Sequence, residues 1–181
     1  MDLSDHIRGL DSFIPDARTG LPEEVFLFVS RLTPLVNVDL LIQDEAGRTL
    51  LTWRDDGLSP LGWHVPGGVI RYMEPAAERI RAVARGELHA EVDFDAAPLA
   101  INELIFPDQP VRGHFYSLLF RCRLRTPLEA ARRYDPGSPK RDSWLWHATF
   151  PQNMIPAHEM YRPFFGDAQG DDAPPAEPRK E

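Results

Sequence analysis

A carboxylate on the apolar face of a helix is the feature that most constrains how this chain folds. Two adjacent glycines, Gly67 and Gly68, precede a segment whose periodicity predicts a helix over residues 76–91. At ~100° of rotation per residue, Glu87 falls within about 20° of Ile80, inside the apolar stripe of that helix. Leaving an ionised carboxylate unpaired against a core is unfavourable. We therefore expect a cation, an arginine or a metal ion beside Glu87, close to the Gly-Gly turn.

Length and charge restrict the class of protein. A chain of 181 residues suits one domain with one core. We expect an N-terminal extension at residues 1–20, the domain at residues 21–165 and a disordered tail at residues 166–181, which is rich in Asp, Ala, Pro, Glu and Gly. The net charge of -8 argues against nucleic-acid binding through phosphate contacts. No apolar run is long enough to cross a membrane and the N-terminus is polar, so a cytoplasmic protein without membrane attachment is expected.

Hydrophobic patterning predicts an α/β domain in which strands and helices alternate. Residues 35–43 and 49–53 are strand-like and flank a turn-forming segment, so they are expected to pair as a hairpin. The single cysteine, Cys122, lies in a strand-like run, which favours a buried packing thiol. The other expected elements are a helix at 21–32, a short strand running into the Gly-Gly turn at 62–68, strands at 99–106, 114–125 and 144–147, and a helical turn at 158–165.

The segment at residues 68–90 resembles the Nudix signature, G-x5-E-x7-R-E-U-x-E-E-x-G-U, where U is an aliphatic residue. Gly68, Glu74 and Glu87 match its first glycine and two of its acids. Other residues stand where the signature has an arginine and two further acids, namely Ala82, Val83 and Gly86. This reduced pattern is similar to the GDP-mannose mannosyl hydrolase branch, and the similarity covers residues 22–165. The resemblance implies a Nudix fold, which is an α/β/α sandwich with a central mixed β-sheet.

The same resemblance implies an activity. It points to a Mg²⁺-dependent hydrolase that acts on a nucleoside-diphosphate sugar such as GDP-mannose and releases the nucleoside diphosphate and the sugar. Glu87 and the backbone carbonyl of Gly67 are the implied metal ligands, which diphosphate oxygens and waters complete to a six-coordinate Mg²⁺. In that branch the metal stabilises the leaving diphosphate while a base activates water to attack the anomeric carbon with inversion. A homodimer is implied as well.

Several side chains are implied as catalytic or substrate contacts. Arg54 matches a family arginine that helps to stabilise the leaving diphosphate, and paired guanidinium donors suit phosphate. Asp39 corresponds to an acid that contacts the nucleotide or its sugar, although an Asp in an apolar strand is equally well explained as a structural hydrogen-bond acceptor. Arg71 is a candidate to replace a family arginine whose position holds Val69. His114 opens a strand that matches the branch, and we assign it to substrate binding.

The general base is not fixed by the sequence. The family has a Gln-His pair where this chain has Lys140 and Arg141, and protonated Lys and Arg have no lone pair with which to bind Mg²⁺ or accept a proton. We assign both to substrate binding through phosphate. The neighbouring Asp142 is our candidate base. The alternatives are Asp135, His114 and His147.

Other functions and ligands stay open. A second hypothesis is a Nudix-fold protein that binds a nucleotide sugar or another ligand without turnover. A third, an ordinary pyrophosphohydrolase, is weakened by the missing paired acids. Glu91 lies where the helix should end and is interpreted as solvated rather than as a second metal ligand. His64 and His89 have no spacing typical of a zinc site, so neither is assigned a role.

Overall fold

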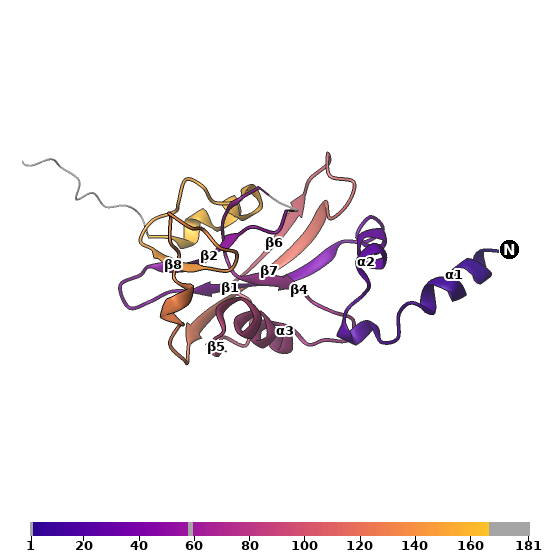
Figure 1. Cartoon of the computed structure of the whole chain (residues 1–181), viewed down its shortest axis with the longest axis horizontal. Helices are drawn as coiled ribbons and strands as arrows, with labels where there is room; N and C mark the ends of the chain where they lie inside the picture. The colour runs from indigo at the N-terminus through magenta and orange to yellow at the C-terminus, as the bar shows by residue number, and fades with distance from the viewer. Residues whose placement is uncertain (1, 58–59, 167–181) are drawn as a thin grey trace, which may run out of the picture.

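The computed structural model describes residues 2–57 and 60–166, whose centre is a mixed β-sheet of five strands (Figure 1). The middle strand, β1, runs antiparallel to β4 and parallel to β7. The long β7 also pairs antiparallel with β5 at one end and with β6 at the other. The strands of this sheet are β1 (Leu35–Ile42), β4 (Gly67–Val69), β5 (Val92–Phe94), β6 (Ala100–Ile105) and β7 (His114–Leu124).

A second, three-stranded sheet lies beside the first. Its middle strand, β2 (Thr49–Arg54), pairs antiparallel with β3 (Gly62–His64) and with β8 (Trp144–His147). The predicted hairpin of the first two strands is therefore wrong. One bridge, between Gln43 and Thr49, joins their ends, and the strands then diverge because β2 finds partners on both sides in the other sheet.

Helices cover both faces of the central sheet. α3 packs against β1 and β4, and the η4 segment lies on the opposite side with the small sheet (Figure 1). The predicted helix over residues 76–91 is α3 followed directly by one turn of π-helix, and it ends at His89, whose backbone is left-handed with φ 52. Figure 1 also shows the unpredicted helix α1 projecting away from the domain. The helical elements are α1 (Leu3–Asp11), η1 (Ala17–Thr19), α2 (Glu23–Val29), α3 (Ala76–Val83), η2 (Ala84–Leu88), η3 (Ala130–Arg132) and η4 (Pro156–Phe164).

The core has two parts, one on each face of the central sheet. Because successive side chains of a strand point to opposite faces, Val38 and Leu40 of β1 pack under α3, whereas Leu41 packs with the second cluster toward η4. The same alternation directs Asn37 and Asp39 to the η4 side. This face carries the candidate site described below.

The predicted fold class is confirmed, because helices flank a central mixed sheet. Cys122 is buried, and burial raises the pKa of its thiol to about 12, as expected for a packing residue. Within residues 2–57 and 60–166, no helix has the length and apolar character that a membrane span requires. The predicted tail lies outside the described residues except for Gly166.

Acid should weaken the fold through His147. This residue of β8 packs against Trp63 with ring centroids 4.5 Å apart, and burial lowers the pKa of its imidazole from 6.5 to about 4. The unfolded ring binds a proton near the ordinary pKa and the folded ring only near the lowered one. Stability is therefore complete above the ordinary pKa and is lost as the pH falls toward the lowered value. We expect His147→Phe, which keeps the ring contact, to remove this part of the acid sensitivity. Urea denaturation of the wild-type protein and the variant at about pH 4.5 and about pH 7 measures the free energy of unfolding of each. If acidification lowers that free energy equally in both proteins, the assignment to His147 is contradicted.

Candidate active site

A cavity of about 340 Å³ opens beside Gly67 and Gly68, and we call it the acidic cavity. It brings together side chains from β1, β2, β3, the π-turn and the loop before β8. Six of the predicted site residues line it: Asp39, Arg54, Gly67, Glu87, Arg141 and Asp142. The structure therefore brings these six residues to one surface, although some of them are more than a hundred residues apart along the chain.

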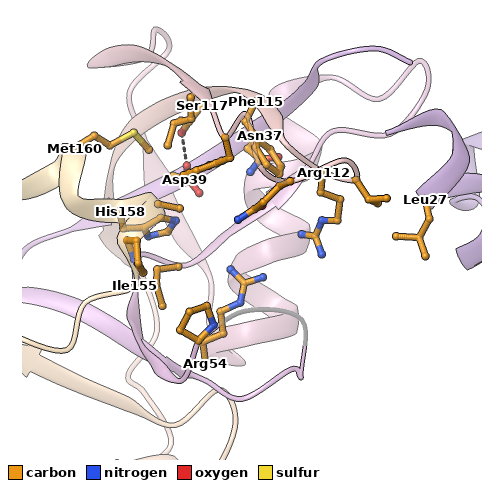
Figure 2. A pocket seen from close by; sticks show the side chains of 17 residues that line it. Leu27, Asn37, Asp39, Arg54, Arg112, Phe115, Ser117, Ile155, His158 and Met160 are labelled. Atoms are coloured by element: carbon orange, nitrogen blue, oxygen red, sulfur yellow. Dashed lines mark hydrogen bonds between the residues drawn. The ribbon is translucent and has the colours of Figure 1, made fainter. Parts of the chain in front are cut away.

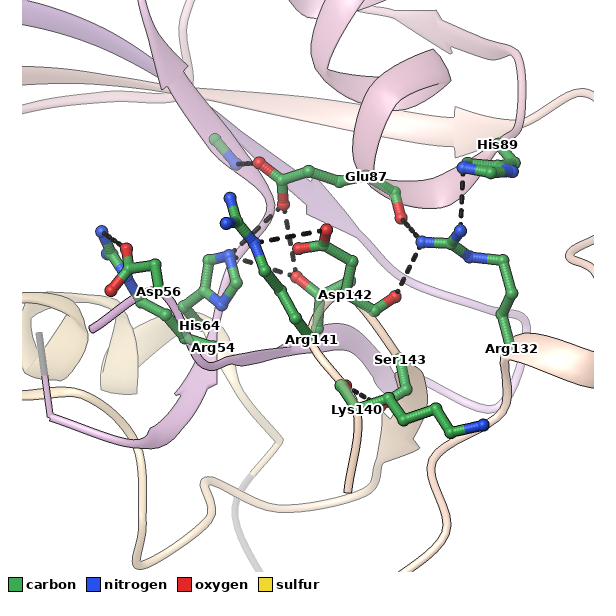
Figure 3. A network of polar contacts seen from close by, with 12 residues as sticks. Arg54, Asp56, His64, Glu87, His89, Arg132, Lys140, Arg141, Asp142 and Ser143 are labelled. Carbon is green, nitrogen blue, oxygen red and sulfur yellow. Dashed lines mark hydrogen bonds and ion pairs between the residues drawn. The ribbon is translucent and has the colours of Figure 1, made fainter. Parts of the chain in front are cut away.

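Glu87 is held in the acidic cavity by three hydrogen-bonding groups (Figure 3). Its Oε1 accepts the backbone N–H of Gly67 at 3.3 Å. Its Oε2 accepts the Thr52 hydroxyl at 3.4 Å and lies 3.3 Å from Nε2 of His64. No lysine or arginine is among these contacts, in which the partners are a backbone N–H, a hydroxyl and an imidazole. Such donors orient a half-buried carboxylate and satisfy part of its hydrogen-bonding capacity.

Gly67 has to be glycine for steric reasons. A Cβ at this position would overlap the Asp39 carboxylate and would lie 2.9 Å from the carbonyl oxygen of Val38. The close approach follows from the antiparallel pairing of Gly67 with Asp39 across β4 and β1. Gly67 and Gly68 belong to β4 and not to the predicted turn, and the missing Cβ of Gly67 lets β4 lie against the Asp39 side chain with the Gly67 N–H directed to Glu87.

Replacing Gly67 with alanine should destabilise the protein by about 1–3 kcal/mol, because buried backbone and carboxylate atoms would have to move. The matched control is Gly86→Ala in the π-turn, where an added Cβ meets nothing within 4 Å. That change should alter stability by less than about 1 kcal/mol. Urea denaturation of both variants compares the two, and equal stabilities would contradict the packing argument.

Asp39 is buried and forms a network below the acidic cavity. Its Oδ2 accepts hydrogen bonds from the hydroxyls of Ser117 and Tyr161, the latter at 2.5 Å. Burial raises the pKa of Asp39 to about 6, the two hydroxyls oppose that rise, and the charge of Glu87 adds to it. The side chain is therefore a structural acceptor that also borders the cavity. Its contact with substrate stays a prediction.

Asp142 faces the same cavity from the loop before β8. Its backbone is left-handed, with φ 59, and its N–H donates to the carbonyl of Trp53 at 2.9 Å. Partial burial raises the pKa of its carboxyl group, and the charge of Glu87 raises it further. Glu87 and Asp142 therefore bring two carboxylates to one cavity, which is an arrangement suited to a bound cation or to proton transfer.

Arg132 fixes the position of both acidic segments. One guanidinium nitrogen donates to the carbonyl oxygens of Glu87 at 3.2 Å and of Asp142 at 3.4 Å. The other terminal nitrogen lies 2.8 Å from Nε2 of His89 (Figure 3). Because it contacts backbone groups behind the cavity, Arg132 positions Glu87 and Asp142 and does not line the acidic cavity itself.

The positive charges of the cavity come from three arginines. Arg54 is paired with Asp56 at 2.7 Å, and Arg141 lies 3.6 Å from the Asp142 carboxylate. Figure 2 shows the guanidinium groups of Arg54 and Arg112 directed toward one another. Burial lowers the pKa of Arg112, and the charge of Arg54 lowers it further. Guanidinium groups that repel each other across a cavity favour an anion between them.

Three predicted substrate residues lie away from the acidic cavity. Arg71 is exposed, and its N–H donates to Glu74 at 2.9 Å. His114 lies 3.2 Å from Glu103 where β7 pairs with β6. Lys140 lines a separate cavity of about 270 Å³, and its side chain points away from Glu87 in Figure 3. The structure does not bring these side chains together with Glu87, and a role for them in substrate binding stays a prediction.

Of the four candidate bases, Asp142 lines the acidic cavity and the other three do not. Asp135 lines the same separate cavity as Lys140 and accepts the N–H of Gly137 at 2.9 Å. His147 packs on Trp63, and His114 lies on β7. Asp142 is thus the candidate that the geometry favours.

Sequence reasoning assigned no role to several residues of the site, among them Asn37, His64, Arg112 and Arg132. Zinc-site spacing indicates several metal ligands close together in the sequence. It cannot predict the single contact between His64 and Glu87, which are distant in the sequence. Alternation along β1 placed Asn37 on the same face as Asp39, and this signal could have found it. Arg112 is in a loop and Arg132 ends the short η3 helix, and neither segment has a periodic pattern that predicts orientation.

The residues present suit a particular kind of metal site. Among the described residues, no group of three or more His, Cys, Asp or Glu side chains is placed to hold a metal ion. Mg²⁺ is commonly bound through one or two carboxylates together with substrate phosphates. Glu87 and Asp142 could supply such oxygens. Because the two carboxylates line one cavity, a bound cation would stabilise their negative charges. The site therefore fits one ion shared with a diphosphate and does not fit a cluster of ions.

Comparison with known proteins identifies the fold. No family model matches the chain. The low-salt glycan biosynthesis protein Agl8 of Haloferax volcanii is 29% identical over 110 residues, which are 59% of this chain and 69% of that protein. A MutT Nudix hydrolase from Burkholderia pseudomallei superposes with a TM-score of 0.55 and 20% identity over 71% of this chain and 95% of its own. A MutT protein from Methanosarcina mazei Go1 superposes with a TM-score of 0.55 and 17% identity over 74% of this chain and 91% of its own. The chain has the Nudix fold.

Proposed function

We propose that this protein hydrolyses a nucleoside-diphosphate sugar, similar to GDP-mannose, at the glycosidic carbon, and that the reaction needs Mg²⁺. The observation that carries the proposal is the acidic cavity, in which Glu87 and Asp142 lie next to Arg54 and Arg112. Carboxylates for a cation and guanidinium groups for phosphate thus line one space. The similarity to Agl8, a protein named for glycan biosynthesis, supports a sugar-containing substrate.

The arginines and the metal ligands would act on the leaving group. Arg54 and Arg112 would bind the diphosphate and stabilise the negative charge that develops on it as the glycosidic bond breaks. Mg²⁺, held by Glu87 and the Gly67 carbonyl, would supply further neutralisation of that charge. His64, Thr52 and the Gly67 N–H keep the Glu87 carboxylate in place.

Asp142 would act as the general base. A base is most effective when its pKa lies near the working pH, and burial together with Glu87 raises the pKa of Asp142 toward that range. Ionised Asp142 would accept a proton from the water that attacks the anomeric carbon. Arg132 donates to the backbone carbonyls of both Asp142 and Glu87. The distance between the proton acceptor and the diphosphate site would therefore stay fixed.

A second candidate function is binding of the nucleotide sugar without turnover. It is favoured by the absence, among the described residues, of a cluster of three or more potential metal ligands. The separate cavity lined by Lys140, Arg133 and Arg141 also offers positive charge, with Asp135 as the carboxylate among its lining residues. An ordinary pyrophosphohydrolase is a weaker candidate, because Val83 and Gly86 leave no companions for Glu87. The homodimer and the lack of nucleic-acid binding stay predictions.

Product analysis separates these functions. Purified protein is incubated with Mg²⁺ and a panel of GDP-, UDP- and ADP-sugars, and the products are separated by anion-exchange chromatography. The proposed reaction gives a nucleoside diphosphate and a free sugar. A nucleoside monophosphate would instead indicate pyrophosphate cleavage. Measurable binding without any product would support the binding function and contradict hydrolysis.

A further inference from the structure

A second cavity adjoins the acidic cavity and differs from it in chemistry. It measures about 350 Å³, and we call it the apolar cavity. Five residues line both spaces, so the two form one continuous cleft: Asn37, Asp39, Arg54, Arg112 and His158. The apolar cavity is otherwise walled mainly by apolar side chains, among them Leu27, Leu104, Phe106, Phe115, Ile155 and Met160. Its volume lies in the range of small-molecule sites in proteins.

Two guanidinium groups lie at the boundary between the two cavities, and that of Arg54 is paired with Asp56. Arg54 and Arg112 line both spaces and point toward one another (Figure 2). An anionic group bound here would have carboxylates on one side and an apolar chamber on the other. A ligand that fills the cleft therefore has a phosphate-like centre and two chemically different ends.

The apolar chamber suits a flat heterocycle better than a sugar. A hexose carries hydroxyl groups around its whole ring and needs a polar partner for each one that is buried. A nucleobase has two apolar faces and a polar edge, and aromatic rings such as Phe106 and Phe115 are suitable packing partners for its faces.

Asn37 provides a polar group for that edge. Its side chain lines both cavities, and its Oδ1 is buried without a hydrogen-bond partner in the described part of the chain. A buried amide oxygen without a donor is unfavourable, so an N–H group of a ligand would stabilise it. Amide side chains recognise nucleobase edges because they offer an acceptor and donors side by side.

We propose that the apolar cavity is the nucleobase subsite, that Asn37 reads the polar edge of the base, and that Arg112 with Arg54 binds the diphosphate at the boundary. The sugar then extends toward Glu87 and Asp142. This assignment takes its ligand class from the proposed function, yet it concerns binding, so it can be tested whether or not hydrolysis occurs.

Calorimetric titration of the full-length protein in the presence of Mg²⁺ tests the subsite. The probes are GDP, ADP, UDP, CDP and inorganic pyrophosphate. At least one nucleoside diphosphate should bind about 10-fold more tightly than pyrophosphate, because the base adds contacts that pyrophosphate lacks. Asn37→Ala should weaken that nucleotide by about 5-fold or more and leave pyrophosphate unchanged. Arg112→Gln should weaken the nucleotides and pyrophosphate alike, by about 10-fold.

A second variant tests the subsite even if Asn37→Ala fails to fold. Ala157 lines the apolar cavity but not the acidic cavity, and Ala157→Phe should fill the chamber. Nucleotide binding should then be lost while pyrophosphate binding persists. The subsite is overturned if pyrophosphate binds as tightly as every nucleotide, or if Ala157→Phe leaves nucleotide affinity intact. Selective nucleotide binding without hydrolysis upholds the subsite and contradicts only the proposed reaction.

Discussion

Replacing Glu87 with glutamine should lower kcat for nucleotide-sugar hydrolysis by about 100-fold or more and abolish its dependence on Mg²⁺. The amide keeps the shape and one acceptor oxygen, so the hydrogen bond from the Gly67 N–H at Oε1 can persist. What is lost is the negative charge that would hold the cation. Initial rates measured over a series of Mg²⁺ concentrations show both effects.

A matched control for this change is Glu91→Gln. Glu91 follows the same helical segment, is exposed, and lies 3.7 Å from Arg125 at the surface. Its replacement should leave the rate and the Mg²⁺ dependence as they are, because exposed ion pairs contribute little. Unchanged activity in Glu87→Gln, or an equal loss in Glu91→Gln, would remove Glu87 from the metal site.

Replacing Asp142 with asparagine should lower kcat by about 100-fold to 10,000-fold without abolishing nucleotide binding. Asparagine tolerates the left-handed backbone that Asp142 adopts, so the loop should keep its conformation. The raised pKa of Asp142 sets the sign of the pH effect. The base acts only when ionised, so activity should rise as the pH increases through that pKa, and the residual activity of the variant should lack this rise.

The alternative bases are tested by the same comparison. Asp135→Asn, His114→Gln and His147→Gln each remove one candidate that lies away from the acidic cavity. If Asp142→Asn keeps its full rate and pH profile while one of these three variants loses them, the base is the residue changed in that variant. Full activity in all four would mean that the water is activated in another way.

The sequence predicted the arrangement of the domain because its signals are local and periodic. β1, β7 and β8 lie close to their predicted ranges, because apolar strand patterns specify them directly. The prediction of a hairpin was wrong because strand pairing depends on residues that are distant in the sequence. A turn such as the one at Asp44 joins β1 and β2, but β2 takes its neighbours from residues near 63 and 145.

A motif could name Gly67 and Glu87 from the sequence, whereas other residues of the candidate site are brought together only by the fold. Helical phase indicated that Glu87 needs a partner, but a π-turn ends the helix, and the partners are Gly67, Thr52 and His64. Burial of Asp39 and Asp142 depends on packing that no pattern in the sequence records. Arg54 ends β2 and Arg132 ends η3, whereas Arg112 and Arg141 reach the cavity from loops.

The central claim is that water attacks the sugar carbon and not a phosphorus atom. The most direct test is hydrolysis of GDP-mannose, or of the best substrate of the panel, in ¹⁸O-labelled water with Mg²⁺, followed by mass spectrometry of the nucleotide product. Attack at the anomeric carbon breaks the bond between that carbon and the phosphate oxygen, so the oxygen of water enters the sugar. The account predicts an unlabelled nucleoside diphosphate. A nucleoside diphosphate that carries ¹⁸O, or a nucleoside monophosphate with or without the label, would contradict it.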